Sequence, residues 1–202
     1  PQVLDLVREF YSDTVEKQHQ VLIDAEDYAS QSVLDHCQDY RCEQRIAVMQ
    51  LQPHQNFQPY FHPEIQLLQV TEADIQRFAW LYLECFEAEN RHAESVEENF
   101  LHKLQVEGVK FYFVQCQDQP VGITGIYQNS QFQILSVGAI KNEFRNFGFH
   151  KAALSWRIQL CRALFPDLPI FSWAYQESIS HANMVKSGMT LSQELLVYRH
   201  VG

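Results

Sequence analysis

The chain has 202 residues, of which 46% are hydrophobic, 13% aromatic and 20% charged, and its formal net charge is -10. This size and composition suit one good-sized globular domain, or a domain with a smaller appendage. The acidic balance argues against non-specific nucleic-acid binding, which needs Lys and Arg to neutralise phosphates. No apolar run is long enough to cross a bilayer. From the charge and from this absence we expect neither a nucleic-acid nor a membrane partner.

The cysteines and histidines indicate no metal or redox site. The five cysteines are odd in number and scattered, with no CxxC pair, which is typical of free thiols in a reducing cytoplasm. None of the nine histidines has the i, i+4 spacing of a zincin helix beside a glutamate. The N-terminal PQVLDLVREF is acidic and amphipathic, unlike a secretory signal. We therefore expect a cytoplasmic protein without a metal.

The first 62 residues predict an N-terminal appendage. Apolar side chains recur every three or four positions through residues 1–40, which predicts helices with one buried face. A short alternating strand follows at Arg45–Leu51. The three prolines of Pro53–Glu64 disfavour helix and predict an irregular connection. We expect a helical appendage with a short strand over residues 1–62 and a main domain over residues 63–202.

The main domain predicts the element order β α α β β β α β α β. Thr71 with Asp74, and Ser95 with Glu98, have the spacing of helix-capping pairs. A tight turn at Asp118 joins two strands into a hairpin, and the later strand–helix–strand crossover predicts a parallel strand pair. The predicted strands are 65–70, 110–117, 119–128, 132–140, 170–175 and 195–201. The predicted helices run from 71 to about 87, from 95 to about 105, from 149 to 164 and from 178 to 186. The third of these helices is expected to bury a stripe of Phe149, Ala153, Trp156, Leu160 and Leu164.

The junction between the strand at 132–140 and the following helix is a candidate anion site. The first turn of a helix has N–H groups without intrahelical partners, and the helix dipole adds partial positive charge there, so backbone alone can bind an anion. Lys141, Arg145, His150 and Lys151 gather around this turn in an acidic chain. Cations at a helix start oppose the dipole unless an anion binds, which favours a functional cluster over a solvated surface pair.

Two segments of the chain resemble the signatures of the GCN5-related N-acetyltransferases (GNAT). The segment RNFGFH at residues 145–150 is similar to the acetyl-CoA loop of the family, which reads Arg or Gln, two residues, Gly, one residue, Gly or Ala. Downstream, ESISHANMVKSGM is similar to a second family signature, with matches at Ser180, Lys186, Gly188 and Met189. The resemblance covers roughly residues 65–201. It implies an α/β fold with a mixed sheet, the GNAT-like acyl-CoA N-acyltransferase fold, to which the appendage is added.

The same resemblance implies acetyl-CoA as the co-substrate. Backbone groups at the end of the strand would pair with the pantetheine arm like an added strand. N–H groups at the helix start would hold the pyrophosphate, with charge from Arg145 and Lys151. His150 departs from the family, which usually has Gly or Ala at this position. Asn146 also departs, because Gly often follows the arginine in the family. The implied cofactor-binding residues are Gly138, Ala139, Ile140, Arg145, Asn146, Phe147, Gly148, Phe149, His150, Lys151 and Ser180.

The catalytic positions of the family are not filled by groups that can transfer a proton. The family chemistry is direct attack of an amine on the thioester. Met184 stands where many members have an acid tyrosine, and Ile134 where some have a base glutamate. His181 lies one helical turn before Met184 and is the nearest replacement, with an ordinary helix histidine as the alternative.

The acceptor side is the least defined part of the sequence. Glu84 and Glu87, at the end of the first helix of the main domain, would attract or deprotonate a cationic amine in this family, or are a solvated helix end. The acceptor is expected to be an amine-bearing small molecule or peptide, with a weak preference for positive charge. The appendage could cover the acceptor groove, shape specificity or mediate a homodimer, and the sequence does not choose among these roles.

Three interpretations stay open at this point. The first is an N-acetyltransferase that relies on proximity and water-mediated deprotonation. The second is a non-catalytic acyl-CoA-binding or interaction module that has kept the cofactor loop. The third is an unrelated α/β protein with a chance motif.

Overall fold

The chain folds into two compact units, which are described separately. The structure is a computed structural model and describes residues 2–12, 19–88 and 91–201. Unit 1 comprises Pro1–Met49, Trp173–Ala182 and Leu191–Gly202, and unit 2 comprises Gln50–Ser172 and Asn183–Thr190. The domain boundary at residue 62 stays a prediction. Within the described ranges, every helix is too short or too polar to cross a bilayer.

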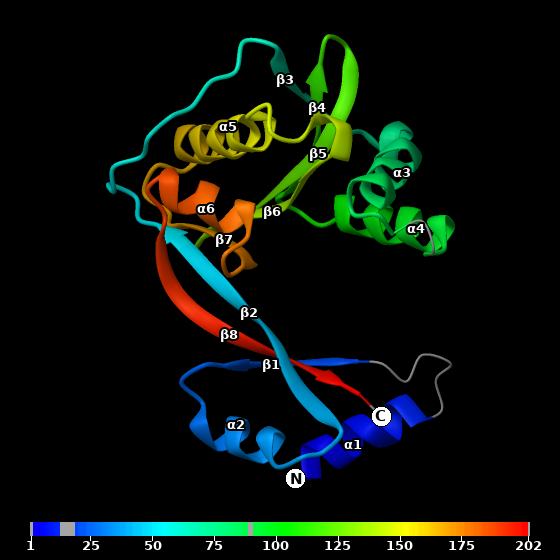
Figure 1. Cartoon of the computed structure of the whole chain (residues 1–202). Coiled ribbons are helices and arrows are strands. Elements are labelled where there is room, and N and C mark those ends of the chain that lie inside the picture. Colours follow the sequence, from blue (N-terminus) through cyan, green and yellow to red (C-terminus); the bar gives the residue numbers. More distant parts are fainter. Residues whose placement is uncertain (1, 13–18, 89–90, 202) are drawn as a thin grey trace. The chain divides into compact units, whose positions relative to one another are not determined.

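The strands form one mixed sheet with the order β1-β8-β2-β7-β6-β5-β4-β3 (Figure 1). Neighbours from β3 to β6 are antiparallel, whereas β6 and β7 are parallel. The mixed sheet, the parallel pair and the element order from β3 onward confirm the prediction. The strands are β1 Gln20–Asp24, β2 Tyr40–Leu51, β3 Ile65–Gln69, β4 Val109–Cys116, β5 Gln119–Gln128, β6 Gln133–Ile140, β7 Ile170–Tyr175 and β8 Thr190–His200. The α-helices are α1 Gln2–Ser12, α2 Tyr28–Asp35, α3 Ile75–Cys85, α4 Ala93–Leu104, α5 Phe149–Leu164 and α6 Ile179–Lys186, and the 3-10 helices are η1 Glu72–Asp74 and η2 Asn142–Phe144.

The N-terminal segment contains a strand where helix was predicted. Residues 20–24 form β1, which pairs antiparallel with β8, with Gln20 opposite Arg199 and Asp24 opposite Leu195. The partner strand supplies hydrogen bonds that override the local helical spacing of Val21 and Leu22. The prediction of helix is therefore wrong for this segment and holds for α1 and α2. The part of the prediction that covers residues 13–18 lies outside the described residues.

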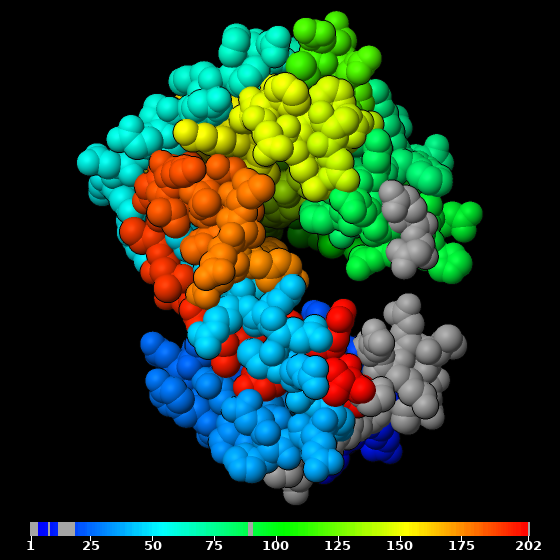
Figure 2. Space-filling model, in the orientation of Figure 1, coloured from blue at the N-terminus to red at the C-terminus, as the bar shows by residue number. Residues whose placement is uncertain are grey.

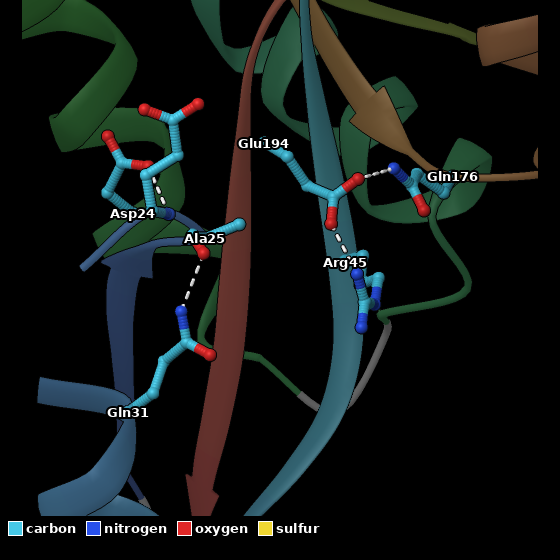
Figure 3. A network of polar contacts seen from close by, with 7 residues as sticks. Asp24, Ala25, Gln31, Arg45, Gln176 and Glu194 are labelled. Atoms are coloured by element: carbon cyan, nitrogen blue, oxygen red, sulfur yellow. Dashed lines mark hydrogen bonds and ion pairs between the residues drawn. The ribbon is translucent and has the colours of Figure 1, made fainter. Parts of the chain in front are cut away.

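Glu194 joins three chain segments within unit 1 (Figure 3). Its carboxylate on β8 accepts hydrogen bonds from Arg45 Nη1 on β2, at 2.5 Å, and from Gln176 Nε2 just after β7. The backbone N–H of Gln176 also donates to the Arg45 carbonyl at 2.9 Å. Because the Arg45 side chain is exposed, the ion pair stabilises the unit by about 1 kcal/mol or less and mainly fixes the register of these strand ends.

Unit 2 packs helices on both faces of its strands. Helices α3 and α4 lie on one face of β3–β6 and α5 lies on the other (Figure 1). Successive residues of β4 alternate between the faces, with Phe113 in the core under α3 and Val114 in the core under α5. On the α3 face, four rings pack together: Phe78, Phe100, Phe111 and Phe113. This core holds the end of α3 beside the candidate site.

Two local predictions about turns are confirmed. Thr71 and Asp74 form a capping box, in which the Asp74 carboxylate accepts from Thr71 N at 3.0 Å and from Thr71 Oγ1 at 2.6 Å. The hairpin between β4 and β5 closes through Gln117 and Asp118, whose φ angles of 49° and 64° are left-handed. Such angles match the right-handed twist of paired strands. Both features depend on a few adjacent residues, which is why sequence alone could predict them.

Several element boundaries and one end of a helical stripe were predicted wrongly. Helix α4 begins at Ala93 after the N-cap His92, and not at Ser95. The strand predicted at Arg45 begins at Tyr40, and the last strand begins at Thr190. On α5, Phe149 and Ala153 of the predicted stripe are buried and Trp156 and Leu160 are partly buried, but Leu164 is 43% exposed. The helix also buries Leu154, Ser155, Ile158 and Cys161 completely. The side of a helix that is buried is the side that contacts the sheet. This contact covers a stripe of the helix surface that is wider than one row of side chains.

Candidate functional site

Strand β6 separates from β7 after a short parallel pairing. The register places Gln133 opposite Ile170 and Ile134 opposite Phe171. At the next step, the Leu135 carbonyl accepts a hydrogen bond from the side chain of Ser172, Oγ to O 3.0 Å. A side-chain bond thus replaces the backbone ladder at Leu135, and the rest of β6 pairs with β5 alone in unit 2.

A β-bulge lies where β6 leaves β7. Between the pairs Thr124–Gly138 and Ile126–Leu135, the single residue Gly125 faces two residues of β6, Ser136 and Val137. Such a bulge bends the strand and leaves ladder groups unpaired. Here the guanidinium of the buried Arg157, on α5, donates from Nη1 to the carbonyls of Ser136, at 2.8 Å, Gly125, at 3.3 Å, and Val137, at 3.4 Å. Arg157 was not among the residues predicted from the sequence, although a charge within the apolar face of α5 was the signal.

The segment after β6 leads directly into α5, as the sequence predicted. It passes through η2, turns at Asn146, with φ 69°, and reaches Gly148, the N-cap of α5, with φ 86°. The first turn of α5 carries no acidic residue, and no side chain caps it among the residues described. The N–H groups of this turn therefore point toward a position that suits an anion.

Arg145 anchors this loop to the end of α3. Its Nε donates to the Ile140 carbonyl at 3.1 Å and its Nη2 to the Cys85 carbonyl at 2.9 Å, and Nη1 lies 3.7 Å from Glu87 Oε1. A cation bound to the last carbonyls of a helix also interacts favourably with the helix dipole. Arg145 thus sets the position of the loop, and its contact with a phosphate stays a prediction.

Glu84 and Glu87, the predicted acceptor residues, contact the same loop. Lys141 Nζ lies 2.9 Å from Glu84 Oε1, and Asn142 Nδ2 donates to Glu87 Oε1 at 2.6 Å. The structure therefore brings the predicted acceptor carboxylates and cofactor-loop residues together. An amine that reaches either carboxylate has to compete with Lys141 or Arg145 for it.

The irregular connection between β2 and β3 lies over the start of α5. Lys151 Nζ lies 4.3 Å from the centroid of the Tyr60 ring, and Tyr60 N donates to Ser155 Oγ at 2.8 Å. A Cβ on Gly148 would lie only 2.6 Å from Tyr60 Oη. In Figure 2 the cyan side chains of the connection lie beside the yellow ones of α5. The connection was predicted from the sequence, but the contact between its Tyr60 and the loop was not.

The connection is also bound to the second signature of the sequence. Gln55 Nε2 donates to the Gly188 carbonyl at 2.6 Å, and Arg162 Nη2 donates to the Gln55 carbonyl at 2.5 Å. Gly188 has φ 95°, and a Cβ there would lie 2.6 Å from the Asn56 carbonyl oxygen. Glycine is therefore required at this position both for its backbone angle and for the close approach of the connection.

His150 lies between α6 and the end of β6 and is neutral at pH 7. Its Nδ1 lies 3.1 Å from Asn183 Nδ2. Burial of the ring and the nearby Arg157 cation lower the pKa of His150 to about 4, although a backbone hydrogen bond with Gly138 raises it. Because an amide nitrogen only donates, the neutral ring accepts at Nδ1 and carries its proton on Nε2.

Stability is expected to fall at acid pH because of His150. The pKa of this group is about 4 when folded and about 6.5 when unfolded, so between these values the unfolded chain binds more protons. The contribution is complete above pH 6.5 and is lost as the pH falls toward 4. From pH 7 to pH 5 we expect the free energy of unfolding of the wild type to fall by about 1–2 kcal/mol more than that of His150→Gln.

Urea titrations at the two pH values measure this difference. The variant His102→Gln, at an exposed position of α4, serves as the control and should follow the wild type. Equal losses in wild type and His150→Gln would show that the His150 ring is not held neutral.

The remaining predicted residues lie on α6 and β6. Ser180 and His181 belong to unit 1, and His181 Nδ1 accepts a hydrogen bond from Glu177 N at 3.3 Å. Met184, at the position of the family acid, is 3% exposed, and Ile134 is partly buried. The catalytic role of His181 and the cofactor role of Ser180 stay predictions. In the residues described, no three His, Cys, Asp or Glu side chains form a group that could hold a metal ion.

Solved structures with the same architecture identify the fold. A GCN5-related N-acetyltransferase from Sphaerobacter thermophilus superposes with a TM-score of 0.73 over 90% of this chain, at 15% sequence identity. The chain has the fold of the GCN5-related N-acetyltransferases. A GCN5-related N-acetyltransferase from Kribbella flavida matches all of the chain with a TM-score of 0.65 and 11% identity. This agrees with the GNAT signatures in the sequence and with the separation of β6 from β7.

The similarity to GNAT proteins is one of fold. A functionally unknown conserved protein from Staphylococcus epidermidis ATCC 12228 has a TM-score of 0.71 over all of this chain at 11% identity. The chain spans 59% of the length of the Sphaerobacter protein, 80% of the Staphylococcus protein and 75% of the Kribbella protein. No protein-family model matches the sequence, and no curated protein matches it by sequence.

Proposed function

We propose that this chain is an acyltransferase of GNAT type that binds acetyl-CoA along β6 and at the start of α5 and transfers the acetyl group to an amine. The observation that carries the proposal is the order of three features along the chain. Strand β6 leaves β7 at Leu135, then passes a bulge, and ends in a loop after which α5 begins without a side-chain cap. The pantetheine arm would add to the free edge of β6, and the N–H groups of residues 146–151 would bind the pyrophosphate.

The residues of the loop fit this group. A glycine at the N-cap allows the left-handed turn that directs the N–H groups outward, and an added Cβ would fill the space next to Tyr60. Lys151, bound to the Tyr60 ring, and Arg145, bound to carbonyls, supply positive charge near these N–H groups. Acetyl-CoA, when bound, supplies an activated thioester. The protein would orient this thioester and exclude water from it.

The acceptor is proposed to be an amine-bearing small molecule or peptide. Glu84 and Glu87 lie beside the loop at the end of α3, where they would attract a cationic amine by competing with Lys141 and Arg145. The net charge of -10 would steer such an acceptor toward the protein. The amine would lose its proton to water, because Ile134, at the position of the family base, cannot accept one. The leaving CoA thiolate would take its proton from His181 or from water, because Met184, at the position of the family acid, cannot donate one.

A second candidate function is acyl-CoA binding without transfer. It is favoured by one observation: the side chain at the position of the family acid, Met184, is apolar and buried. This candidate keeps the binding surface along β6 and α5 and drops only the chemistry.

Release of free thiol from acetyl-CoA separates the two functions. The added amines are polyamines, free amino acids and short peptides. We expect the rate of thiol release with one of these acceptors to exceed the rate without an acceptor. Saturable binding of CoA with no acceptor-dependent thiol release would favour the binding module. His181→Ala, assayed beside the wild type, tests the proposed proton donor through the pH dependence of kcat.

A further inference from the structure

Arg157 is a buried cation without an acidic partner. The residue is 2% exposed, and no carboxylate of the described residues pairs with it. Burial lowers the pKa of its guanidinium to about 10, so it is still charged at pH 7. An unpaired buried charge destabilises a fold unless its hydrogen bonds offset the loss of hydration.

The hydrogen bonds of Arg157 go to the β6 bulge. Nη1 donates to the Ser136 carbonyl at 2.8 Å and lies 3.3 Å and 3.4 Å from the Gly125 and Val137 carbonyls, while Nε donates to Ala153, in its own helix, at 3.4 Å. The bulge places Gly125 opposite two residues, so these carbonyls lack the regular ladder partners. One planar guanidinium therefore satisfies the irregular part of the sheet.

The position of this contact connects it with the proposed donor site. The bulge begins directly after Leu135, where the pairing with β7 ends, and directly before Gly138, where the predicted pantetheine edge begins. A Cβ on Gly138 would lie 2.9 Å from Arg157 Nη2. The guanidinium therefore packs against the backbone of Gly138 itself, on the α5 side of the sheet.

We propose that Arg157 is a positioning residue of the donor site, which holds the bulge carbonyls of β6 and so sets the direction in which the Gly138–Ile140 edge faces the pantetheine arm. This inference rests on the proposed function. Arg157 has no direct contact with the reacting atoms in the proposal; it acts through the backbone. A lysine at this position keeps the charge, but its side chain ends about one bond short of Nη1, and it has no second nitrogen to lie against Gly138 as Arg157 Nη2 does.

Two ligands distinguish positioning from a general structural role. Coenzyme A uses both the β6 edge and the start of α5, whereas adenosine 3′,5′-bisphosphate lacks the pantetheine arm and uses only the latter. For Arg157→Lys we expect the dissociation constant of CoA to rise by about tenfold, the effect of about 1.4 kcal/mol, with that of adenosine 3′,5′-bisphosphate unchanged. Because both constants are measured on the same variant, a loss of folded protein changes the number of sites and not their ratio.

Arg162→Lys is the matched control. Arg162 lies on the same helix and also donates to a backbone carbonyl, that of Gln55, but it does not touch the bulge. We expect its ratio of the two dissociation constants to equal that of the wild type. If the wild type binds CoA and Arg157→Lys has the same ratio of the two dissociation constants as the wild type, the positioning role is overturned. A wild type that binds neither ligand overturns the proposed function itself.

Discussion

Replacing Gly148 by alanine is expected to raise the dissociation constant of CoA by about tenfold or more, because two costs of about 1 kcal/mol or more each add at this position. The φ of 86° is unfavourable for any residue with a Cβ, and the new Cβ would lie 2.6 Å from Tyr60 Oη. Relief requires either a shift of the first turn of α5 or displacement of Tyr60 from Lys151. Both movements disturb the N–H groups that are proposed to hold the pyrophosphate.

Gly108→Ala is the control for this variant. Gly108 has φ 84°, and its Cβ would lie 1.9 Å from the Gln128 carbonyl oxygen. Its backbone conflict is therefore at least as severe, but it affects the end of β5 that is remote from the loop, since the other end of β5 pairs with Ile140. We expect a lower melting temperature and an unchanged CoA affinity for Gly108→Ala. Wild-type affinity in Gly148→Ala, measured by calorimetry, would remove the α5 N-terminus from the site.

The second large effect is expected in the core under α3. Phe78 is fully buried, and its ring centroid lies 5.0 Å from those of Phe100 and Phe111 and 5.9 Å from that of Phe113. Phe78→Ala removes a ring that bridges α3, α4 and β4, and the rigid rings around it cannot close the cavity. We expect the free energy of unfolding to fall by about 3–5 kcal/mol.

Trp80 offers a control on the same helix. Its side chain is 60% exposed, so Trp80→Ala removes a larger ring and is expected to change the free energy of unfolding by about 0.5 kcal/mol or less. Urea unfolding of the two variants beside the wild type measures the difference. Equal losses from the two substitutions would contradict the assigned packing of α3.

The features predicted correctly from sequence are those set by neighbouring residues. The Thr71–Asp74 capping box and the two-residue turn at Gln117 and Asp118 need only a few adjacent side chains. The place of Gly148 between β6 and α5 was predicted in the same way, whereas its left-handed angle was not. Strand β1 could not be predicted in this way, because its strand conformation depends on pairing with β8 near the other end of the chain.

The candidate site shows the same division. The sequence predicted the loop and its cations, but the groups that hold these cations are distant in the chain: the Cys85 carbonyl for Arg145, Glu84 for Lys141 and the Tyr60 ring for Lys151. Arg157 was missed for a related reason. Charged residues on helices are usually solvated, and only the bulge in β6 shows why this one is buried.

The most direct test of this account is a titration of the wild-type chain with CoA, followed by calorimetry and by thermal unfolding. We expect saturable binding with one site per chain, and a melting temperature that rises with CoA concentration, as for any ligand that binds only the folded state. No heat of binding and no change in melting temperature at millimolar CoA would contradict it.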